Sequence, residues 1–316
     1  MPALVETMAY RMESERDRAW HGLGVTCDHA MSSEEALKLS GLDWEVIPQD
    51  VIITKVGKKE IVIPNTKANI RNTDGSVLGI VTNKYRIVQN TEAFKFTDSL
   101  VGEGITYETA GSLMGGRKIW LLARLPEQVI VNDQYIPYLC FVNSHDGKGS
   151  VRASLVTVRV VCNNTLNLAL SSAPRSWSIR HSSKVEARLQ EAHKTLFHAT
   201  VYMDKFKVEA EKMASIKISK SQYERIVEKL FVIDDDMSDR EKKNKELLRQ
   251  GAMEAYAVPD LNNIRGTAWG ALSAISDFVY HKKPQRESQT YKERKMLWAV
   301  MGNPILDQAK ELLLST

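Results

Sequence analysis

The chain has 316 residues, 43% of them hydrophobic and 26% charged, which is the balance of a folded globular protein. Its net charge of +4 is only mildly basic, and no apolar run approaches the length of a membrane-spanning helix. The N-terminus lacks the basic and apolar segments of a secretory signal. Three cysteines, Cys27, Cys140 and Cys162, are spaced too irregularly for a disulfide framework or a zinc site. These features predict a protein of the reducing cytoplasm, with no cofactor, no bound metal and no membrane partner.

In the first half of the chain, apolar and polar residues alternate with the period of two that is typical of β-strands. Ser32, followed by two acids, predicts the start of a helix that Gly41 ends, and a second helix is expected over 91–100. Tight turns are predicted at Asp74-Gly75, Gly115-Gly116 and Asp146-Gly147. The predicted strands cover residues 44–47, 51–54, 61–63, 67–71, 77–81, 106–111, 118–124, 129–131, 138–143 and 151–161.

From Asn163 onward the apolar spacing becomes helical. The polar corner Asn163-Asn164-Thr165 is expected to begin a helix, and further helices are predicted over 183–215, 219–257, 266–282 and 290–314. We therefore predict an α+β fold, with an antiparallel twisted sheet and flanking helices followed by a mainly helical C-terminal region. The predicted parts are an N-terminal arm (1–30), a sheet domain (31–170) and a helical region (171–316).

Excess positive charge is concentrated after residue 170. Residues 171–230 hold twelve lysines and arginines against seven acids, whereas residues 231–280 hold six against nine. Two interpretations stay open: solvated helix faces, or a surface that contacts phosphates.

Arginines follow one another through the last predicted strand and beyond it. Arg159 leads into the Asn163-Asn164 corner, where a helix N-terminus and an arginine would bind phosphate, although capping with a structural salt bridge is an alternative. Further on, basic side chains interleave with an aromatic one, which is typical of a groove that follows a single strand. The predicted nucleic-acid-binding residues are Arg152, Arg159, Arg175, Trp177, Arg180, Lys184 and Arg188.

Nothing in the chain has the pattern of a catalytic or metal site. His21 has no carboxylate or nucleophile beside it, and Ser144-His145-Asp146 are adjacent turn residues rather than a triad assembled from separate positions. Asp234-Asp235-Asp236 fits a solvated turn better than a metal site. Trp20 is expected to dock the N-terminal arm on the domain or on a neighbouring subunit. The predicted structural or interface residues are Trp20, His21, Gly22, Gly24, Asn163 and Asn164.

Seven short segments, in order along nearly the whole chain, are distinctive. They are Trp20-His21-Gly22-Leu23-Gly24, Leu42-Asp43-Trp44-Glu45-Val46, Tyr85-Arg86-Ile87-Val88-Gln89-Asn90, Asn143-Ser144-His145-Asp146-Gly147, Arg159-Val160-Val161-Cys162-Asn163-Asn164-Thr165-Leu166, Arg180-His181 and Arg265-Gly266-Thr267-Ala268-Trp269. Together they resemble the phage/plasmid-like protein family, a domain of unknown function numbered nine hundred and thirty-two. The resemblance implies carriage on phages, plasmids and integrated elements, and it implies no established activity. A weaker, fold-level similarity is to ring-forming single-strand annealing proteins.

The leading hypothesis is an oligomeric protein that binds or anneals single-stranded DNA in replication or recombination, without bond chemistry, in the cytoplasm of a prokaryotic host. One alternative is a protein-binding host-interaction or anti-defence factor. Another is an enzyme such as a nuclease, which the absence of a carboxylate cluster at metal-binding spacing disfavours.

Overall fold

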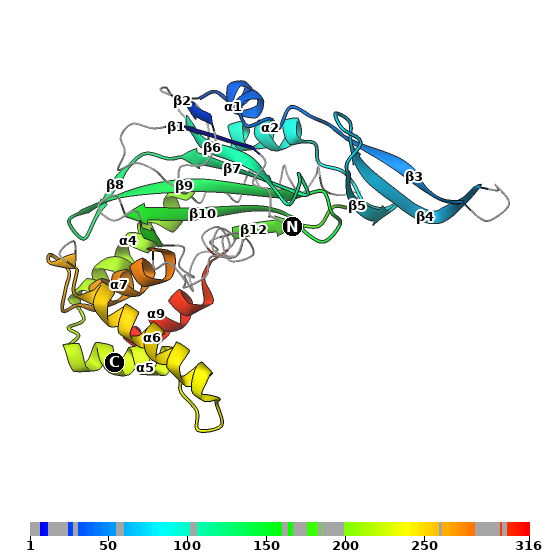
Figure 1. Cartoon of the computed structure of the whole chain (residues 1–316). Coiled ribbons are helices and arrows are strands. Elements are labelled where there is room, and N and C mark those ends of the chain that lie inside the picture. The colour runs from blue at the N-terminus through cyan, green and yellow to red at the C-terminus, as the bar shows by residue number, and fades with distance from the viewer. Residues whose placement is uncertain are drawn as a thin grey trace. The chain divides into compact units, whose positions relative to one another are not determined.

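The computed structural model describes residues 7–11, 25–27, 31–54, 60–101, 106–159, 164–166, 176–182, 185, 199–258, 261–281, 298 and 302–316. Its strands are β1 Thr7–Arg11, β2 Val25–Cys27, β3 Val46–Thr54, β4 Glu60–Arg71, β5 Val77–Thr82, β6 Thr106–Leu113, β7 Lys118–Arg124, β8 Gln128–Ile130, β9 Asp133–Ser144, β10 Val151–Arg159, β11 Asn164–Leu166 and β12 Ser176–Ile179 (Figure 1). Its helices are α1 Ser33–Leu39, α2 Asn90–Val101, α4 Ala199–Ser215, α5 Lys220–Leu230, α6 Asp239–Tyr256, α7 Ala268–His281 and α9 Pro304–Leu314.

The chain forms two compact units that interleave along the sequence. The first unit holds Met1–Leu125, Tyr138–Leu155 and Ser176–His198, and the second holds Pro126–Pro137, Val156–Arg175 and Ala199–Thr316. The division therefore falls within β9 and β10. Among the helices that the structure describes, none is both long and apolar enough to cross a membrane.

Antiparallel pairing dominates the sheets. The larger sheet has the order β11-β10-β9-β7-β6-β1-β2, with β12 on β10 and β8 on β9, and the smaller sheet has the order β3-β4-β5. The described β1–β2 pair is parallel, whereas β6–β7, β7–β9 and β3–β4 are antiparallel. The predicted fold class, antiparallel sheets with flanking helices and a helical C-terminal region, is confirmed.

The hairpins turn where short glycine signals predicted them. Gly75, Gly115 and Gly147 all have positive φ and lie in the β4–β5, β6–β7 and β9–β10 turns. Some strands are longer than predicted, because β-bulges let a strand continue past residues that have a low propensity for strand structure. β3 continues across a register shift after Asp50, and β4 runs through Asn65, whose φ is 56°.

The expected helix start at the Asn163-Asn164-Thr165 corner is wrong. Asn164–Leu166 is strand β11, whose residues pair antiparallel with Thr157–Arg159 of β10. Strand hydrogen bonds thus satisfy the backbone that a helix cap was expected to satisfy. A second strand after residue 163, β12, pairs with the first half of β10. Helices dominate the described chain from Ala199 onward, as expected.

The loop between β9 and β10 is seated directly on β5 in the first unit. A Cβ added at Gly79 would lie 2.5 Å from the Cα of Asp146, and one at Gly147 would lie 2.9 Å from a Val81 methyl group. These distances leave no room for a side chain at Gly79. The absence of a Cβ at this position is what lets the loop touch the strand.

An aromatic cluster forms the core of the second unit. The indole nitrogen of Trp269 donates a hydrogen bond to the Tyr135 hydroxyl at 3.1 Å, and the Trp269 ring meets Phe206 edge-on at 5.7 Å. Trp269 belongs to α7, which is buried along most of its length and contacts α4, α6, α9 and β11. Helix α7 therefore organises the packing of the helical region.

Replacing Gly79 by alanine should destabilise the protein by about 2 kcal/mol, because the new methyl group collides with the backbone of Asp146. The matched control is Gly75→Asn. Gly75 has φ +72° with open space around it, and asparagine tolerates that conformation, so a change within about 0.5 kcal/mol is expected. Urea unfolding of both variants measures the difference. Equal stabilities would contradict the tight seating of the loop.

Candidate nucleic-acid interface at the loop end of the first unit

Five chain segments meet at one end of the first unit, here called the loop end: residues 71–76, 83–89, 114–118, 145–150 and 180–182. Backbone hydrogen bonds join them, from His145 N to the Arg117 carbonyl at 2.7 Å and from Arg86 N to the His181 carbonyl at 3.4 Å. The Tyr85 hydroxyl donates to the Ser144 carbonyl. Segments that are far apart in the sequence thus form one continuous surface.

His145 lies fully buried at the centre of the loop end. Its Nε2 is 3.0 Å from the Asn90 Oδ1, and its carbonyl accepts from the Asn69 Nδ2 at 2.8 Å. The Asn90 amide donates to the Leu42 carbonyl, which fixes its oxygen toward the histidine. The Nε2 of His145 therefore carries a proton and donates it to the Asn90 oxygen.

His181 forms the second half of this buried core. Its ring stacks on Tyr85 with centroids 4.5 Å apart, and its Nδ1 donates to the Arg86 carbonyl at 2.9 Å. Within the described part of the chain, the other nitrogens, Nδ1 of His145 and Nε2 of His181, are buried without a hydrogen-bond partner. Each ring therefore has a bare lone pair, and although the Asp146 carboxylate favours the charged form of both rings, burial outweighs it.

Burial keeps both histidines neutral near pH 7. Burial, reinforced by the neighbouring His181, lowers the pKa of His145 to about 3. Burial also lowers the pKa of His181, although its hydrogen bond to the Arg86 carbonyl opposes the shift. Ser144 does not engage His145, because its hydroxyl donates to the Asp146 carboxylate at 2.6 Å instead. The Ser144-His145-Asp146 segment thus works as a structural turn.

The surface above the buried histidines is basic. The five segments carry seven lysines and arginines against two aspartates, and one aspartate, Asp74, lies 3.5 Å from Arg71. Arg71 also lies over the Trp44 ring, 5.0 Å from its centroid. The exposed cations are Lys84, Arg86, Arg117, Lys148 and Arg180.

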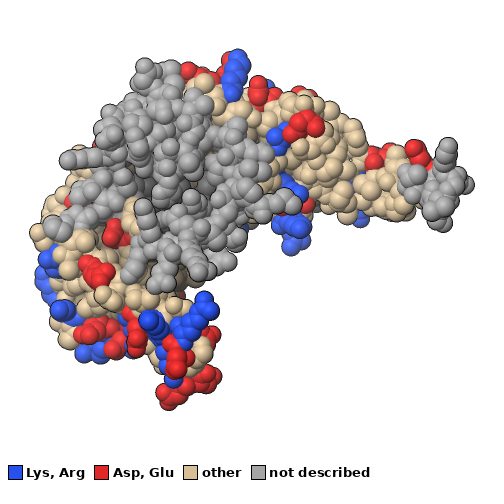
Figure 2. All heavy atoms as spheres, viewed as in Figure 1, with Lys and Arg blue, Asp and Glu red and all other residues tan. Residues whose placement is uncertain are grey.

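Four of these cations are available to a ligand. Of the salt bridges between described residues, none engages Lys84, Arg117, Lys148 or Arg180. By contrast, α5 and α6 of the second unit show basic and acidic side chains side by side (Figure 2). Cations on converging loops that form no salt bridge with another described residue have the chemistry that recognition of a polyanion requires.

The structure separates some of the nucleic-acid-binding residues predicted from the sequence. Arg180 lies at the loop end, exposed. Arg152 pairs with Ser178 and Trp177 pairs with Ala153, so Arg152 and Trp177 point to opposite faces of the sheet. Arg152 reaches Ser176, and Trp177 stacks on Phe96 with centroids 6.2 Å apart. These two residues therefore do not share a groove wall.

Other predicted positions fall outside what the structure describes. For Arg159 and Asn164 the strand positions are described and the side chains are not. The remaining predicted residues, outside the described ranges, are Arg175, Lys184, Arg188, Trp20, His21, Gly22, Gly24 and Asn163.

Sequence reasoning missed the other basic loop-end residues, Lys84, Arg86, Arg117 and Lys148. Each stands in a turn or loop with only one or two other cations nearby in the sequence, so no linear basic cluster marks them. The available signal was indirect. Tyr85–Asn90, Asn143–Gly147 and Arg180-His181 are three of the distinctive segments, and all three meet at the loop end.

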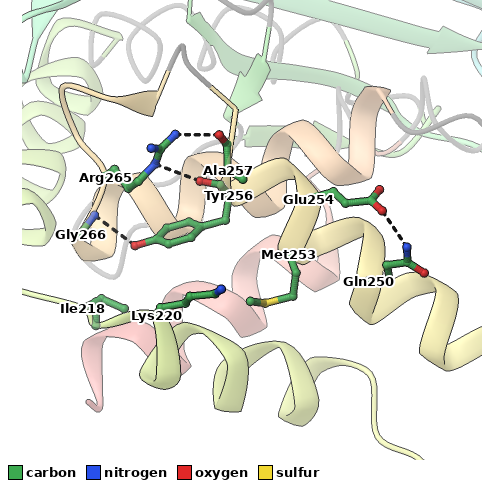
Figure 3. Close-up of a pocket in the computed structure, with 9 residues that line it drawn as sticks. All are labelled: Ile218, Lys220, Gln250, Met253, Glu254, Tyr256, Ala257, Arg265 and Gly266. Carbon is green, nitrogen blue, oxygen red and sulfur yellow. Dashed lines mark hydrogen bonds between the residues drawn. The ribbon is translucent and has the colours of Figure 1, made fainter.

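A shallow pocket of about 800 Å³ lies in the second unit, between α5, α6 and the segment before α7 (Figure 3). Arg265 lines it, but its guanidinium donates to the Tyr256 and Ala257 carbonyls at the end of α6. The backbone nitrogen of Gly266 donates to the Tyr256 hydroxyl. The polar groups of this segment are thus used in hydrogen bonds at the C-terminal end of α6. The pocket therefore offers a ligand mainly apolar contacts, from Ile218 and Met253.

The buried histidines should make the fold sensitive to acid. The pKa of His145 in the folded protein lies below its ordinary value of 6.5. Below about pH 6.5, the unfolded chain therefore binds a proton at His145 that the folded chain does not bind. Stability is then full above about pH 6.5 and falls by roughly 1.4 kcal/mol per pH unit below it. Between pH 7.5 and 5, His145 alone should cost about 2 kcal/mol.

Urea unfolding across this pH range, for the intact protein and for His145→Gln, measures the effect. The variant lacks the titrating ring, so its stability should vary less with pH even if it is lower at pH 7.5. Parallel pH profiles for the two proteins would show that His145 is not held neutral by the fold.

Comparison with known proteins gives one match. A sequence model of the family described as "Domain of unknown function (DUF932)" matches residues 77–301. No curated protein and no solved structure matches the chain. The matched region contains four of the five loop-end segments and the core helices of the second unit. Because the match covers well over half of the chain, the protein belongs to the DUF932 family.

Proposed function

We propose that this protein binds single-stranded nucleic acid through the loop end of its first unit, in the replication or recombination of a phage, plasmid or integrated element. The observation that supports the proposal is the convergence of Lys84, Arg117, Lys148 and Arg180, which form no salt bridge among the described residues. On binding, the cations of such a surface would release the counterions that are condensed on the nucleic-acid backbone. The action is binding or annealing, with no bond made or broken.

A single strand suits this surface better than a duplex does. The cations come from four short loops rather than from a helix or ribbon shaped for a groove. Loops that present separate point charges can follow a flexible backbone. The amide side chains of Asn72 and Asn83, both exposed on or beside these turns, add donors for phosphate or base edges.

We propose that the arginines predicted from the sequence to bind nucleic acid form a second group of contacts. Arg180 belongs to both groups, and Arg152 lies on the neighbouring strand β10. The proposed location is the cytoplasm of a prokaryotic host, where the buried thiol of Cys140 would stay reduced. We also propose that the protein acts as a homo-oligomer.

Removing loop-end cations should weaken binding in a salt-dependent way. Arg117→Ala and Arg180→Ala should each reduce the magnitude of the slope of log affinity against log salt by about 0.7. Each variant has one phosphate contact fewer, so its binding releases fewer counterions. Fluorescence anisotropy with a labelled oligonucleotide, repeated over a range of salt concentrations, measures the slope. The control is Lys207→Ala, an exposed lysine on α4 of the second unit, which should leave the slope unchanged. If the intact protein does not bind the oligonucleotide at low salt, the proposal fails and a protein-binding role becomes the better candidate.

Trp177 provides a separate test of base stacking. Its ring is half-buried against Phe96, so only its remaining exposed surface can meet a base. Trp177→Ala should cost roughly 1–3 kcal/mol of binding free energy while the salt slope stays constant, since stacking releases few counterions. Trp177→Phe, which retains an aromatic ring, should restore part of the loss. Affinity unchanged in a folded Trp177→Ala protein would remove this residue from the interface.

A further inference from the structure

The small sheet β3-β4-β5 exposes an unusual amount of aliphatic surface. It holds seven of the twelve large hydrophobic side chains that are exposed among the described residues. These are Ile47, Ile52, Ile53, Ile61, Val62, Val77 and Ile80. Scattered exposed aliphatics are normal in a monomer, but a concentration on one element marks an interaction surface.

Strand register shows how the outer face is built. Ile47 pairs with Ile70, and Ile70 with Val77, so these three side chains form one row across the sheet. The next row contains Gln49, Ala68 and Ile80. Neither row contains a charged residue. We call this surface, with Thr66 and Thr82, the outer face.

The opposite face of the same sheet is already occupied. By the strand register, Val46 and Val81 belong to this face and are buried, and the His145–Ser150 loop is seated against Gly79 and Val81. The sheet therefore has a satisfied inner face and an aliphatic outer face.

Beyond β5 the sheet narrows to a two-stranded ribbon. β5 pairs with β4 only at Thr66–Ile70, so the rest of β4 is paired with β3 alone. Ile52 pairs with Val62 and Ile53 with Ile61 in consecutive rows, which puts one aliphatic pair on each face of the ribbon. An isolated ribbon of this kind is marginal in water and gains stability from a covering surface.

We propose that the outer face is a self-association surface that packs face to face against the same surface of a second copy of this chain. An uncharged aliphatic face is complementary to itself, because a two-fold contact brings apolar rows onto apolar rows and leaves no charge unpaired. On the side that Figure 2 shows, the arm that β3 and β4 form is mostly tan, with a few charged side chains. Without an aromatic ring or a cation, the face suits a nucleic acid poorly.

The outer face and the two-stranded ribbon that continues it are together large enough for such a contact. β4 has 12 residues and β5 has 6. Three strands about 4.8 Å apart, continued by two, therefore present roughly 500 Å² per copy. Two copies together would bury roughly 1,000 Å², about the lower limit for a specific interface. Pro48 on the edge strand β3 has no N–H to donate, which favours contact through the face rather than through the edge.

The proposal rests on the homo-oligomer that we propose above, but its test is the association state of the full chain without nucleic acid, so the result is independent of the proposed nucleic-acid binding. Sedimentation velocity over a dilution series should show the intact protein above its monomer mass of 35.7 kDa. Ile80→Glu places a charge on the outer face and should raise the dissociation constant at least about tenfold. The matched control, Val208→Glu, changes a side chain on α4 that is 64% exposed and should associate like the intact protein.

Circular dichroism establishes that each variant is folded. Should Ile80→Glu fail to fold, Ile47→Gln removes apolar surface from the same face without a charge and should also weaken association. An intact protein that is monomeric at about 50 μM would overturn the proposal. A folded Ile80→Glu or Ile47→Gln protein that associates as tightly as the control would overturn it as well.

Discussion

The contact between the His145–Ser150 loop and strand β5 is the constraint on which the first unit depends. The Asp146 backbone occupies the space that a side chain at position 79 would need, so only glycine permits the contact. Once the loop is seated, His145 binds Asn69 of β4, Asn90 of α2 and the Arg117 carbonyl of the β6–β7 turn. One buried residue thus joins both sheets of the unit to a helix.

The same contact explains how a basic surface can stand above a pair of histidines. A charged His145 would repel Arg71, whose own charge lowers the pKa of this ring, and burial favours the neutral form of both imidazoles. The positive charge of the loop end is therefore carried by side chains that reach solvent, where a phosphate can meet them. The cost of this arrangement is a fold that loses stability when the pH falls low enough to protonate the core.

The sequence predicted features that depend on neighbouring residues and missed features that depend on distant ones. The Asp74-Gly75 and Gly115-Gly116 turns follow from local backbone preferences, and both were correct. The Asn163–Thr165 corner was predicted as a helix start, because the same polar residues cap helices and end strands, and only pairing with β10 decides between the two.

The candidate site was the least predictable part, for the same physical reason. His145 meets residues 55 and 76 positions away, and His181 meets Arg86 across 95 positions. Trp177 was predicted as a stacking surface from its basic neighbours, yet its ring already stacks on Phe96 of α2. Periodicity and composition contain no information on such contacts, which arise only when the sheet and the helices pack.

The two proposed surfaces of the first unit differ in the chemistry that they offer, and that difference lets both act at once. The loop end offers four exposed cations that form no salt bridge with another described residue, whereas the outer face of β3-β4-β5 offers aliphatic rows and no charge. A second copy bound through the outer face would bring a second set of loop-end cations into the same assembly. A strand bound by one copy then meets the second loop end at a high effective concentration, so two weak sites act as one stronger site. Seven cations against two acids is a modest charge for one copy. Doubling it through self-association is a physical reason for a mildly basic protein of this kind to act as an oligomer on a polyanion.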